Sequence, residues 1–503
     1  TRLLLSENEK RNWFTIAEIN QSTTAVVNLN HFITNTHNPV DLILADIALG
    51  TENLKRMVSL SDGFQLTNNE MCFARHYTNT LFNIMRGGVF VNNYMIDKAD
   101  FRRYFWQINR LISKEYQHWF DKLPANISYA ALTGHAEKTN DADLIRIVGE
   151  YLPLTFSRRH GDPSRPWNRF SIETKNTDGS VKYYYEGNWR DIFQNWEALC
   201  YSFPEYTEGI ISKFVNSSTC DGYNPYRIMR EGIDWEVPEP DDPWAYIGYW
   251  GDHQIIYLQK LLELSFHFHP DKPTRLLTSD IYTYANVPYR IKAYGDIIKN
   301  PKDTVVFDFE LNHRIKTETT YLGADACMLK SREDERIYKV NLTEKILVAL
   351  LSKLSNFVPE AGIWLNTQRP EWNDANNALV GNGTSMVTLY YLRRFLHFWA
   401  DKFSDASFSA VNVSEEVAIL LESMHKFLDG NSDLLKCRMS DSERYGFVDY
   451  LGKAHSKYRD EIYKHSFSGV KRQLQVKNLV LFFRLCLKYI DHSIRANKRK
   501  DGL

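Results

Sequence analysis

The chain has 503 residues, of which 43% are hydrophobic and 24% are charged, with 16 prolines and 24 glycines. These proportions are typical of a folded globular protein and exclude disordered and collagen-like chains. Lys and Arg number 61 against 62 for Asp and Glu, which gives a formal net charge of -1. Because no excess of positive charge is available to hold a polyanion, we expect neither nucleic acid nor an anionic membrane as a partner.

The remaining composition favours a protein that handles small polar ligands. Aromatic residues make up 14% of the chain, and the flat faces of Trp and Tyr suit sugar rings. The cysteines show no spacing typical of a zinc site or a redox pair, so we expect reduced thiols, no metal and a cytoplasmic protein. No glycine-rich nucleotide motif is present, so we expect no cofactor. No apolar run approaches the roughly 18 residues of a membrane span.

Apolar residues near helical spacing predict helices through the first half of the chain. The expected helices cover residues 9–35, 41–60, 75–86, 99–123, 139–151, 190–201 and 205–216. Between them, a loop at 157–163 leads into a β-hairpin pattern with strands at 169–172 and 181–185.

The second half of the chain likewise combines predicted helices with a short β segment. Residues 275–335 carry short β-branched and aromatic runs such as 304–309, which predict a second β excursion. Ser414 precedes an acidic first turn and an apolar stripe, and Gly430 follows, which is typical of a capped amphipathic helix. The expected helices cover residues 247–267, 338–356, 384–403, 414–429, 441–465 and 474–497.

About a dozen helices joined by loops of unequal length, with small β excursions, predict an all-α toroid of helical hairpins. No repeat of fixed period occurs, which makes an α-solenoid the less favoured all-α alternative. In a toroid the helix faces are used for packing, so we expect a site in the loops that lead into helices.

The first candidate cluster is Gly187-Asn188-Trp189-Arg190-Asp191, at the start of the helix over 190–201. An adjacent Arg and Asp can hold vicinal hydroxyl groups, because Arg donates hydrogen bonds and Asp accepts them. The alternative is a carboxylate favoured by the helix dipole beside an ordinary surface arginine.

The second cluster runs from Asp234 to Gln254 and interleaves carboxylates with aromatic side chains. Trp250, with Asp252 and His253, would present a stacking face beside hydrogen-bonding groups. The alternative is an acidic, solvated loop before a buried helix.

The third cluster is Arg369 to Gly383, which contains Glu371, Trp372 and Asp374 among several Asn residues. Inverting cleavage of a glycosidic bond needs a carboxylic acid that protonates the leaving oxygen, and Asp374 is a candidate for that role. An Asn-rich turn held by Asx hydrogen bonds is the alternative. His267 and His269 lack a carboxylate at metal spacing, so we expect both to be structural.

The third cluster also carries a family resemblance. Pro-Glu-Trp-Asn-Asp-Ala-Asn-Asn-Ala-Leu-Val-Gly resembles the Asp-Trp-Asn-Asp-Gly-Met-Asn-Arg-Val-Gly segment of the cellobiose and chitobiose phosphorylase family, in the six-hairpin (α/α)6-barrel glycosidase superfamily. The resemblance implies that Asp374 is the general acid. It places Glu371 in the position of the first Asp of that segment and Trp372 beside the sugar, so both are expected to bind substrate.

The other two clusters fit the same family. Asn-Trp-Arg-Asp-Ile-Phe-Gln resembles the family's Phe-Arg-Asp-Gln-Leu-Gln-Asp segment, which implies that Arg190 and Asp191 hold the nonreducing-end sugar. Trp250-Gly251-Asp252-His253 is similar to an acidic loop of these barrels, so Trp250, Asp252 and His253 are expected to line the substrate site.

The resemblance also implies a domain organisation. Residues 1–65 would be the helical linker that in this superfamily follows an N-terminal β-sandwich, and residues 66–503 the (α/α)6 barrel. We expect the sandwich and a closing C-terminal part to lie outside this sequence, or a second copy to be the partner.

The hypothesis from the sequence is an inverting enzyme acting on a gluco-oligosaccharide, preferably a glycoside phosphorylase with inorganic phosphate as co-substrate. An inverting, amylo-glucosidase-like hydrolase is the first alternative, and Glu236, Glu239, Asp242 and Asp252 are available as its base. A non-catalytic oligosaccharide-binding protein on the same fold is the second alternative.

Overall fold

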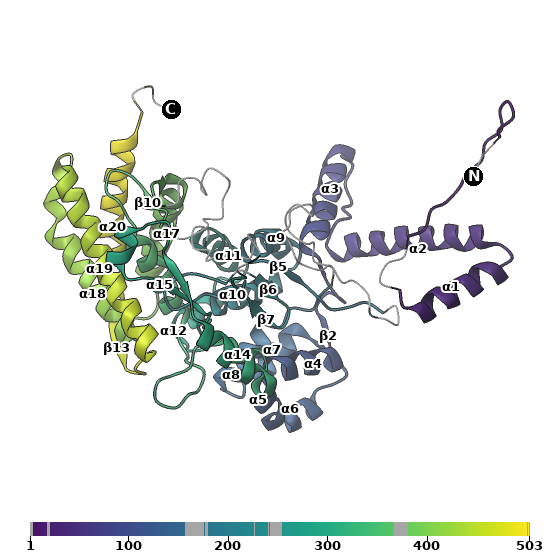
Figure 1. The fold of residues 1–503 in the computed structure, drawn as a ribbon, viewed down its shortest axis with the longest axis horizontal. Helices are drawn as coiled ribbons and strands as arrows, with labels where there is room; N and C mark the ends of the chain where they lie inside the picture. Colours follow the sequence, from purple (N-terminus) through teal and green to yellow (C-terminus); the bar gives the residue numbers. More distant parts are fainter. Residues whose placement is uncertain are drawn as a thin grey trace. The chain divides into compact units, whose positions relative to one another are not determined.

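The chain folds into a mostly helical structure with sheets of only two or three strands (Figure 1), which confirms the predicted all-α class with small β-hairpins. Its chain contacts divide it into two compact units, Thr1–Ser59 and Leu60–Leu503. The computed structural model describes residues 4–17, 21–155, 176, 180–225, 227–239, 241, 254–366, 381–499 and 501.

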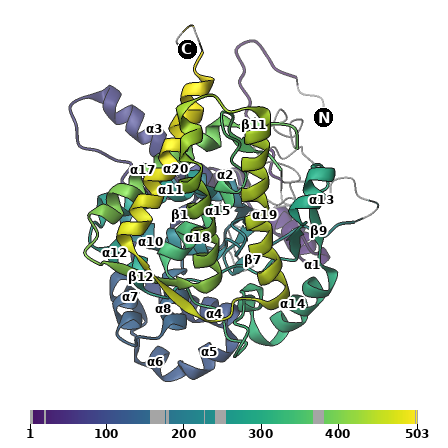
Figure 2. The same cartoon turned by 90° about the vertical axis from the view of Figure 1, so that its left-hand side faces the viewer.

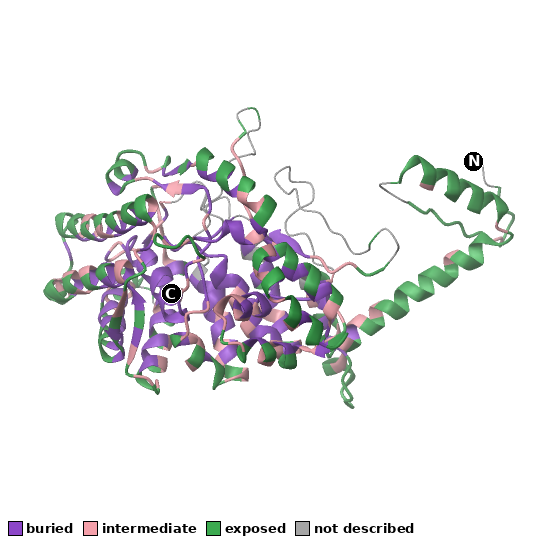
Figure 3. Ribbon diagram, turned by 90° about the horizontal axis from the view of Figure 1, so that it is seen from below, coloured by how far each residue is buried: buried purple, intermediate pink, exposed green. Residues whose placement is uncertain are grey.

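The first unit consists mainly of two helices, α1 (Thr23–Asn35) and α2 (Pro39–Leu60). The predicted helix over 9–35 is wrong in its first half, because Ser22 caps α1 by accepting a hydrogen bond from the backbone N–H of Ala25. Helix α1 has no buried residue and α2 buries only Val58, so both are exposed along their length (Figure 3). Large apolar side chains therefore face solvent in this unit, Phe32 and Ile47 among them.

The second unit begins with α3 (Glu70–Gly87) and a set of shorter helices. The single helix expected over 99–123 is broken at Asn109, whose side-chain oxygen accepts hydrogen bonds from the N–H groups of Leu111 and Ile112 and so starts a new helix. Helix α7 was not predicted at all. The shorter helices are α4 (Lys98–Ile108), α5 (Arg110–Glu115), α6 (Gln117–Lys122), α7 (Tyr129–Glu137) and α8 (Ala142–Gly149).

The middle of the chain departs most from the prediction. Of the strand expected at 181–185, Val181 forms a single β-bridge, and the continuous strand β5 begins only at Glu186. The loop at 157–163 and the partner strand expected at 169–172 lie outside the described residues. The strand within 304–309 is confirmed as Val305–Phe307, but an unpredicted helix, α14, follows it directly. The helices here are α9 (Trp189–Ser202), η1 (Pro204–Tyr206), α10 (Thr207–Asn216), α11 (Gln254–Phe268), α12 (Lys272–Thr278), α13 (Tyr294–Lys299), α14 (Phe309–Leu322) and η2 (Ala324–Cys327).

The C-terminal helices agree best with the prediction. The helix expected over 441–465 has those bounds, and Ser440 and Glu443 form a capping box at its start. Ser414 precedes α18 as expected, but its hydroxyl donates to the buried carboxylate of Glu344 and does not cap the helix. The helices are α15 (Leu342–Leu354), α17 (Met386–Ser404), α18 (Glu415–Gly430), η3 (Ser432–Lys436), α19 (Asp441–His465) and α20 (Val476–Asn497).

All the paired strands that the structure describes are short and antiparallel, and several directly precede helices. One sheet has three strands, β5 (Glu186–Asn188), β6 (Arg227–Met229) and β7 (Gly232–Asp234). The two-stranded sheets pair β1 (Val89–Phe90) with β4 (Leu154–Thr155), β2 (Met95–Asp97) with β3 (Asn126–Ser128), β8 (Tyr289–Ile291) with β9 (Val305–Phe307), β10 (Ile363–Trp364) with β11 (Thr384–Ser385), and β12 (Ala410–Ser414) with β13 (Lys471–Gln475).

Helix α15 lies at the centre of the second unit, in contact with α11, α12, α18 and α19 (Figure 2). Every one of its residues is buried, including Glu344, Lys345 and Lys353. Burial lowers the pKa of Lys345 well below its ordinary value, and its ammonium lies over the ring of Tyr284, 3.5 Å from the ring centroid. An inner helix of this kind fits the predicted toroid.

Buried ion pairs join α4 and α8 to the rest of the unit. The guanidinium of Arg230 donates to Asp100 at 2.5 Å, and the Tyr151 hydroxyl donates to the same carboxylate oxygen at 2.6 Å. Arg146 donates to Asp325 at 2.6 Å, and both side chains are 1% exposed. Buried charges need such partners, so these contacts fix residues 98–151 against segments far away in the chain. Along the described parts of the chain, no helix has the length and apolar character to cross a membrane.

Candidate functional site

The side chains of the predicted site residues lie outside the described part of the structure. Glu371, Trp372 and Asp374 belong to residues 367–380, and Trp250, Asp252 and His253 belong to 242–253, both outside the described residues. The backbones of Arg190 and Asp191 lie in the first turn of α9, but their side chains are not described. The structure does describe the segments that flank these residues.

The first motif enters α9 from strand β5. Asn188, at the end of β5, lies opposite Arg227 of β6, which in turn lies opposite Asp234 of β7. The next residue, Trp189, is 1% exposed, and its ring lies 4.3 Å from that of Phe214, measured between centroids. This packing fixes the start of α9, and with it the backbone of Arg190, beside the hairpin of β6 and β7.

That hairpin leads into the second motif. Arg227 lies 3.2 Å from Glu186 and also pairs with Asp234, so a row of charges crosses the three-stranded sheet. After β7, the indole N–H of Trp235 donates to the side-chain oxygen of Asn312 at 3.0 Å. The Tyr289 hydroxyl donates to the carbonyl oxygen of Glu236 at 2.8 Å. The described start of the second motif is thus held on β8 and α14.

Strands β10 and β11 pair on either side of residues 367–380, which contain most of the third motif. The N–H of Leu365 donates to the carbonyl oxygen of Gly383 at 3.0 Å, and the N–H of Gly381 donates back to the carbonyl of Leu365 at 2.6 Å. Gly381 has a φ of 80°, which favours glycine. A Cβ atom on Gly381 would lie 2.9 Å from the carbonyl oxygen of Pro301, so the backbone here is pressed against the turn between α13 and β9.

Two amides connect the chain before the third motif to the segment between α10 and β6. The side-chain N–H of Asn366 donates to the side-chain oxygen of Asn356 at 2.7 Å, and Asn356 donates to the hydroxyl of Tyr223 at 3.4 Å. Tyr223 stands four residues before β6, and the Lys353 ammonium lies 4.8 Å from the centroid of its ring. The flank of the third motif is thus linked to Tyr223, four residues before β6, and β6 pairs both with β5, which leads into the first motif, and with β7, where the second motif begins.

Sequence reasoning did not single out Tyr223, Lys353, Asn356 or Asn366. Tyr223 and Asn356 are separated by 133 positions along the chain, and no local pattern signals that they meet. Lys353 stands in an apolar helix, where a lysine is usually exposed at the helix surface. Its full burial could be predicted only from the tertiary packing of α15.

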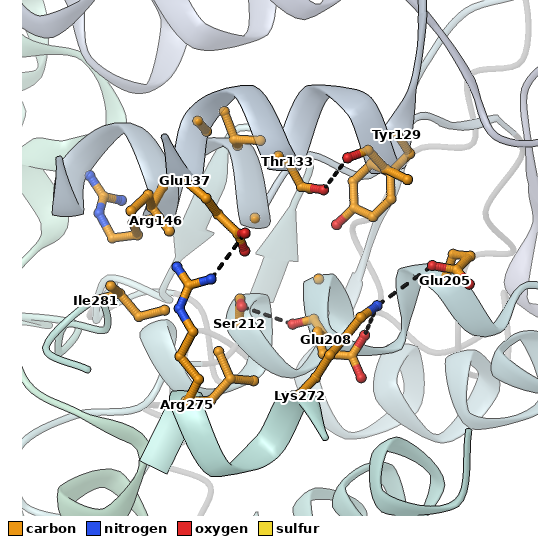
Figure 4. A pocket seen from close by; sticks show the side chains of 18 of the residues that line it. Tyr129, Thr133, Glu137, Arg146, Glu205, Glu208, Ser212, Lys272, Arg275 and Ile281 are labelled. Carbon is orange, nitrogen blue, oxygen red and sulfur yellow. Dashed lines mark hydrogen bonds and ion pairs between the residues drawn. The ribbon is translucent and has the colours of Figure 1, made fainter. Parts of the chain in front are cut away.

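A separate cavity of about 510 Å3 lies among α7, α8, α10 and α12 (Figure 4). Ion pairs cross it, with Arg275 of α12 lying 3.0 Å from Glu137 of α7. Lys272 lies 3.5 Å from Glu205 and 3.4 Å from Glu208. Each of these two cations therefore has a carboxylate partner across the cavity.

The described residues contain a histidine–carboxylate contact at His269 but no cluster suited to a metal ion. His269 lies 2.9 Å from Glu208, and this hydrogen bond raises the pKa of His269. That contact agrees with the expected structural role of His269. Within the ranges that the structure describes, no group of three or more His, Cys, Asp or Glu side chains could hold a metal ion. All six cysteines are unpaired, and those other than Cys72 and Cys437 are buried.

One family model matches part of the chain. Residues 90–153 are similar to the model described as glycoside hydrolase family 149 insertion domain 1. The matched segment contains α4 to α8 and so supplies Tyr129, Glu137 and Arg146 to the cavity of Figure 4. No curated protein matches the chain. The family match supports a carbohydrate-active protein of the glycoside hydrolase type.

Proposed function

We propose that this protein is an enzyme that cleaves, or reversibly forms, a glycosidic bond of a gluco-oligosaccharide with inversion. The observation that carries the proposal is the connection between the motif flanks, which runs from Asn366 through Asn356 to Tyr223, and from the following strand β6 to β5 and β7. Three loops that are far apart in the sequence thereby start or end within one region, as an active site built from loops requires. The match of residues 90–153 to a glycoside hydrolase family segment supports the same class of substrate.

The proposed roles follow the chemistry of inverting cleavage. Asp374 would protonate the leaving oxygen, while phosphate or water attacks the anomeric carbon from the opposite face of the sugar. Arg190 and Asp191 would donate to and accept from the hydroxyl groups of the nonreducing-end sugar. The remaining proposed contacts with substrate are Trp250, Asp252, His253, Glu371 and Trp372.

We prefer phosphorolysis to hydrolysis because the segment around Asp374 resembles that of glycoside phosphorylases. The nucleophile would then be inorganic phosphate, and no cofactor is needed. An inverting hydrolase needs instead a carboxylate base that activates water, and Glu236 is one of its candidates at the start of the second motif. An oligosaccharide-binding protein without catalysis would use the same aromatic side chains.

The experiment is a screen of the full chain against α- and β-linked gluco-oligosaccharides, with and without inorganic phosphate. Both free sugar and sugar 1-phosphate are measured in each arm. We expect sugar 1-phosphate only when phosphate is present. Free sugar in both arms would replace the phosphorylase by the hydrolase. Oligosaccharide binding in calorimetry without either product would leave only the binding protein and overturn the proposed catalysis.

A further inference from the structure

Glu360 has a backbone conformation that is unusual for its residue type. It lies in the turn between α15 and β10, and its φ is 58°. This left-handed region is unfavourable for a long side chain such as that of glutamate. Residues with such strain persist only where the surrounding structure holds them, and they are concentrated at functional sites. The contacts of Glu360 show what holds it in this conformation.

The carboxylate of Glu360 is buried and binds groups of α19 and α20. Its side chain is 3% exposed. One oxygen accepts a hydrogen bond from the N–H of Met439, just before α19, at 2.9 Å, and it lies 3.2 Å from the imidazole of His492 on α20. The other oxygen accepts from the guanidinium of Arg444 at 3.3 Å. Burial alone would raise the pKa of Glu360, but these partners lower it below its ordinary value, so the carboxylate is ionised.

Helix α20 also holds the backbone of Glu360. The N–H of Glu360 donates to the hydroxyl oxygen of Ser493 at 2.9 Å, and the side-chain amide of Asn497 donates to the carbonyl oxygen of Glu360 at 2.8 Å. These partners and Met439 follow Glu360 by 79 to 137 positions along the chain. Glu360 is therefore bound through its side chain and its backbone to two helices that come much later in the sequence.

The turn that contains Glu360 lies directly against β10 and β11. The N–H of Val358 donates to the carbonyl oxygen of Gly362 at 2.9 Å and closes the turn, and β10 begins at the next residue, Ile363. A Cβ atom on Gly362 would lie 2.8 Å from the carbonyl oxygen of Ser385, at the end of β11. The turn is thus continuous with the strand before residues 367–380 and is packed against the strand after them.

The two helices have their own means of stabilisation. Helix α19 starts with the capping box of Ser440 and Glu443, so it does not need Glu360 as a cap. Helix α20 packs along α17 and buries a stripe of apolar side chains. Since both helices are fixed without Glu360, the contacts of its carboxylate and backbone serve to hold the turn, and with it the position of β10.

We propose that Glu360 is a positioning residue for the general acid. It fixes the chain on both sides of residues 367–380, the segment that carries Asp374, and it acts through β10 and β11 without taking part in bond cleavage. This inference rests on the proposed function. The acid is used in the chemical step, whereas the sugar is bound mainly by other residues. Loss of the Glu360 carboxylate should therefore lower kcat and leave KM nearly unchanged.

The test compares substitutions at position 360 in the full chain by steady-state kinetics. Glu360→Gly and Glu360→Asn tolerate the positive φ but have no carboxylate, so they separate the backbone conformation from the charge. We expect kcat to fall on the order of tenfold in both, as a small displacement of a catalytic group does. Glu360→Gln should lose less, because its amide oxygen still accepts from the N–H of Met439. Arg444→Met, at a half-buried position of α19, should also lower kcat and decides the matter if the Glu360 variants do not fold.

Hydrogen–deuterium exchange gives a second readout that needs no turnover. The amides of residues 363–366 and 381–385 should exchange faster in Glu360→Asn than in the parent. The matched control is Glu422→Gln, which removes an exposed carboxylate that pairs with Arg472 at 2.9 Å and should change neither exchange nor kcat.

Parent-like kcat in Glu360→Gly and Glu360→Asn would overturn the positioning role, and so would unchanged exchange in the two strands. A parent chain that turns over no oligosaccharide would instead contradict the proposed function. In that case the exchange rates alone decide whether Glu360 holds the flanks of residues 367–380.

Discussion

Trp364 donates a hydrogen bond from its indole nitrogen to the carbonyl oxygen of Gly381, at 3.1 Å. The contact spans 17 positions and ties together the two chain ends that flank residues 367–380. Gly381 is at the same time pressed against Pro301, in the turn between α13 and β9. The base of the segment that carries Asp374 is therefore held from two directions.

Gly381→Ala should lower turnover, because Gly381 helps to hold the chain ends that flank residues 367–380. The added methyl group would meet the backbone of Pro301, and the φ of 80° is strained for alanine. We expect kcat to fall at least tenfold while the fold loses about 2 kcal/mol of stability. Steady-state kinetics and denaturant unfolding check this. Gly430→Ala, where nothing lies within 4 Å of the new carbon, is the control. Equal kinetics in the two variants would show that the packing around Gly381 does not affect catalysis.

Asp374→Asn should lower turnover roughly a hundredfold or more, because an amide cannot protonate the leaving oxygen. A general acid must be protonated to act, so parent activity should fall on the alkaline side of the pH profile, and this limb should vanish in the variant. The measurement is kcat/KM as a function of pH. Asp401→Asn, at an exposed position of α17, serves as control. Parent-like activity of the Asp374 variant would move the acid to another residue.

Arg190→Ala and Asp191→Ala should each weaken transition-state binding by about 2 kcal/mol, because each leaves a sugar hydroxyl or a protein group without its partner. The loss is read from kcat/KM on the best oligosaccharide of the screen. Gln194→Ala, on an exposed position of the same helix, should leave kcat/KM unchanged. Parent-like kinetics for both charged positions would remove the start of α9 from the site.

Lys213→Met should change how stability depends on pH. Burial lowers the pKa of Lys213 to about 8, and its ammonium donates to the carbonyl of Arg230 at 2.8 Å. Above that value the native lysine is neutral while the unfolded lysine still binds a proton, so this residue makes stability rise with pH until the unfolded lysine also titrates. From about pH 8 to about pH 10, the free energy of unfolding of the parent should rise by roughly 2 kcal/mol relative to that of the variant.

Urea unfolding at several pH values measures this difference. Lys426→Met is the control, because that lysine is exposed on α18 and should show a constant difference from the parent. A flat difference for the Lys213 variant as well would mean that Lys213 keeps its ordinary pKa in the folded protein.

Gly452→Ala should destabilise the protein by about 1–3 kcal/mol, as overpacking does. A Cβ atom there would lie 2.2 Å from the ring of Tyr294, so the ring would have to leave α19. Gly446→Ala, on the same helix, meets nothing within 4 Å and should instead gain up to about 1 kcal/mol from helix propensity. Thermal unfolding of the two variants gives opposite signs if Tyr294 packs as described.

The sequence predicted long, capped helices well and short ones poorly. The helix over 441–465 has both an amphipathic pattern and a capping box, so local signals agree with tertiary packing. The break at Asn109 depends on a side chain that caps the next helix, and a periodic apolar pattern hides it. Helix α7, with Ala, Thr and Gly in its middle, offers little apolar pattern to detect.

For the site, the sequence identified three motifs but not the residues that join them. The hydrogen bonds from Asn366 to Asn356 and from Asn356 to Tyr223 depend on how α15 is placed between distant helices. No spacing along the chain encodes that placement.

The burial of α15 has a consequence for the order in which the protein can be made. Its contacts come from α11 and α12, which precede it, and from α18 and α19, which are synthesised up to about a hundred residues later. A nascent chain that has reached Leu354 therefore has an apolar helix whose C-terminal neighbours do not yet exist. Such a surface is prone to aggregation until it is covered, so this unit completes its folding only once α19 has left the ribosome.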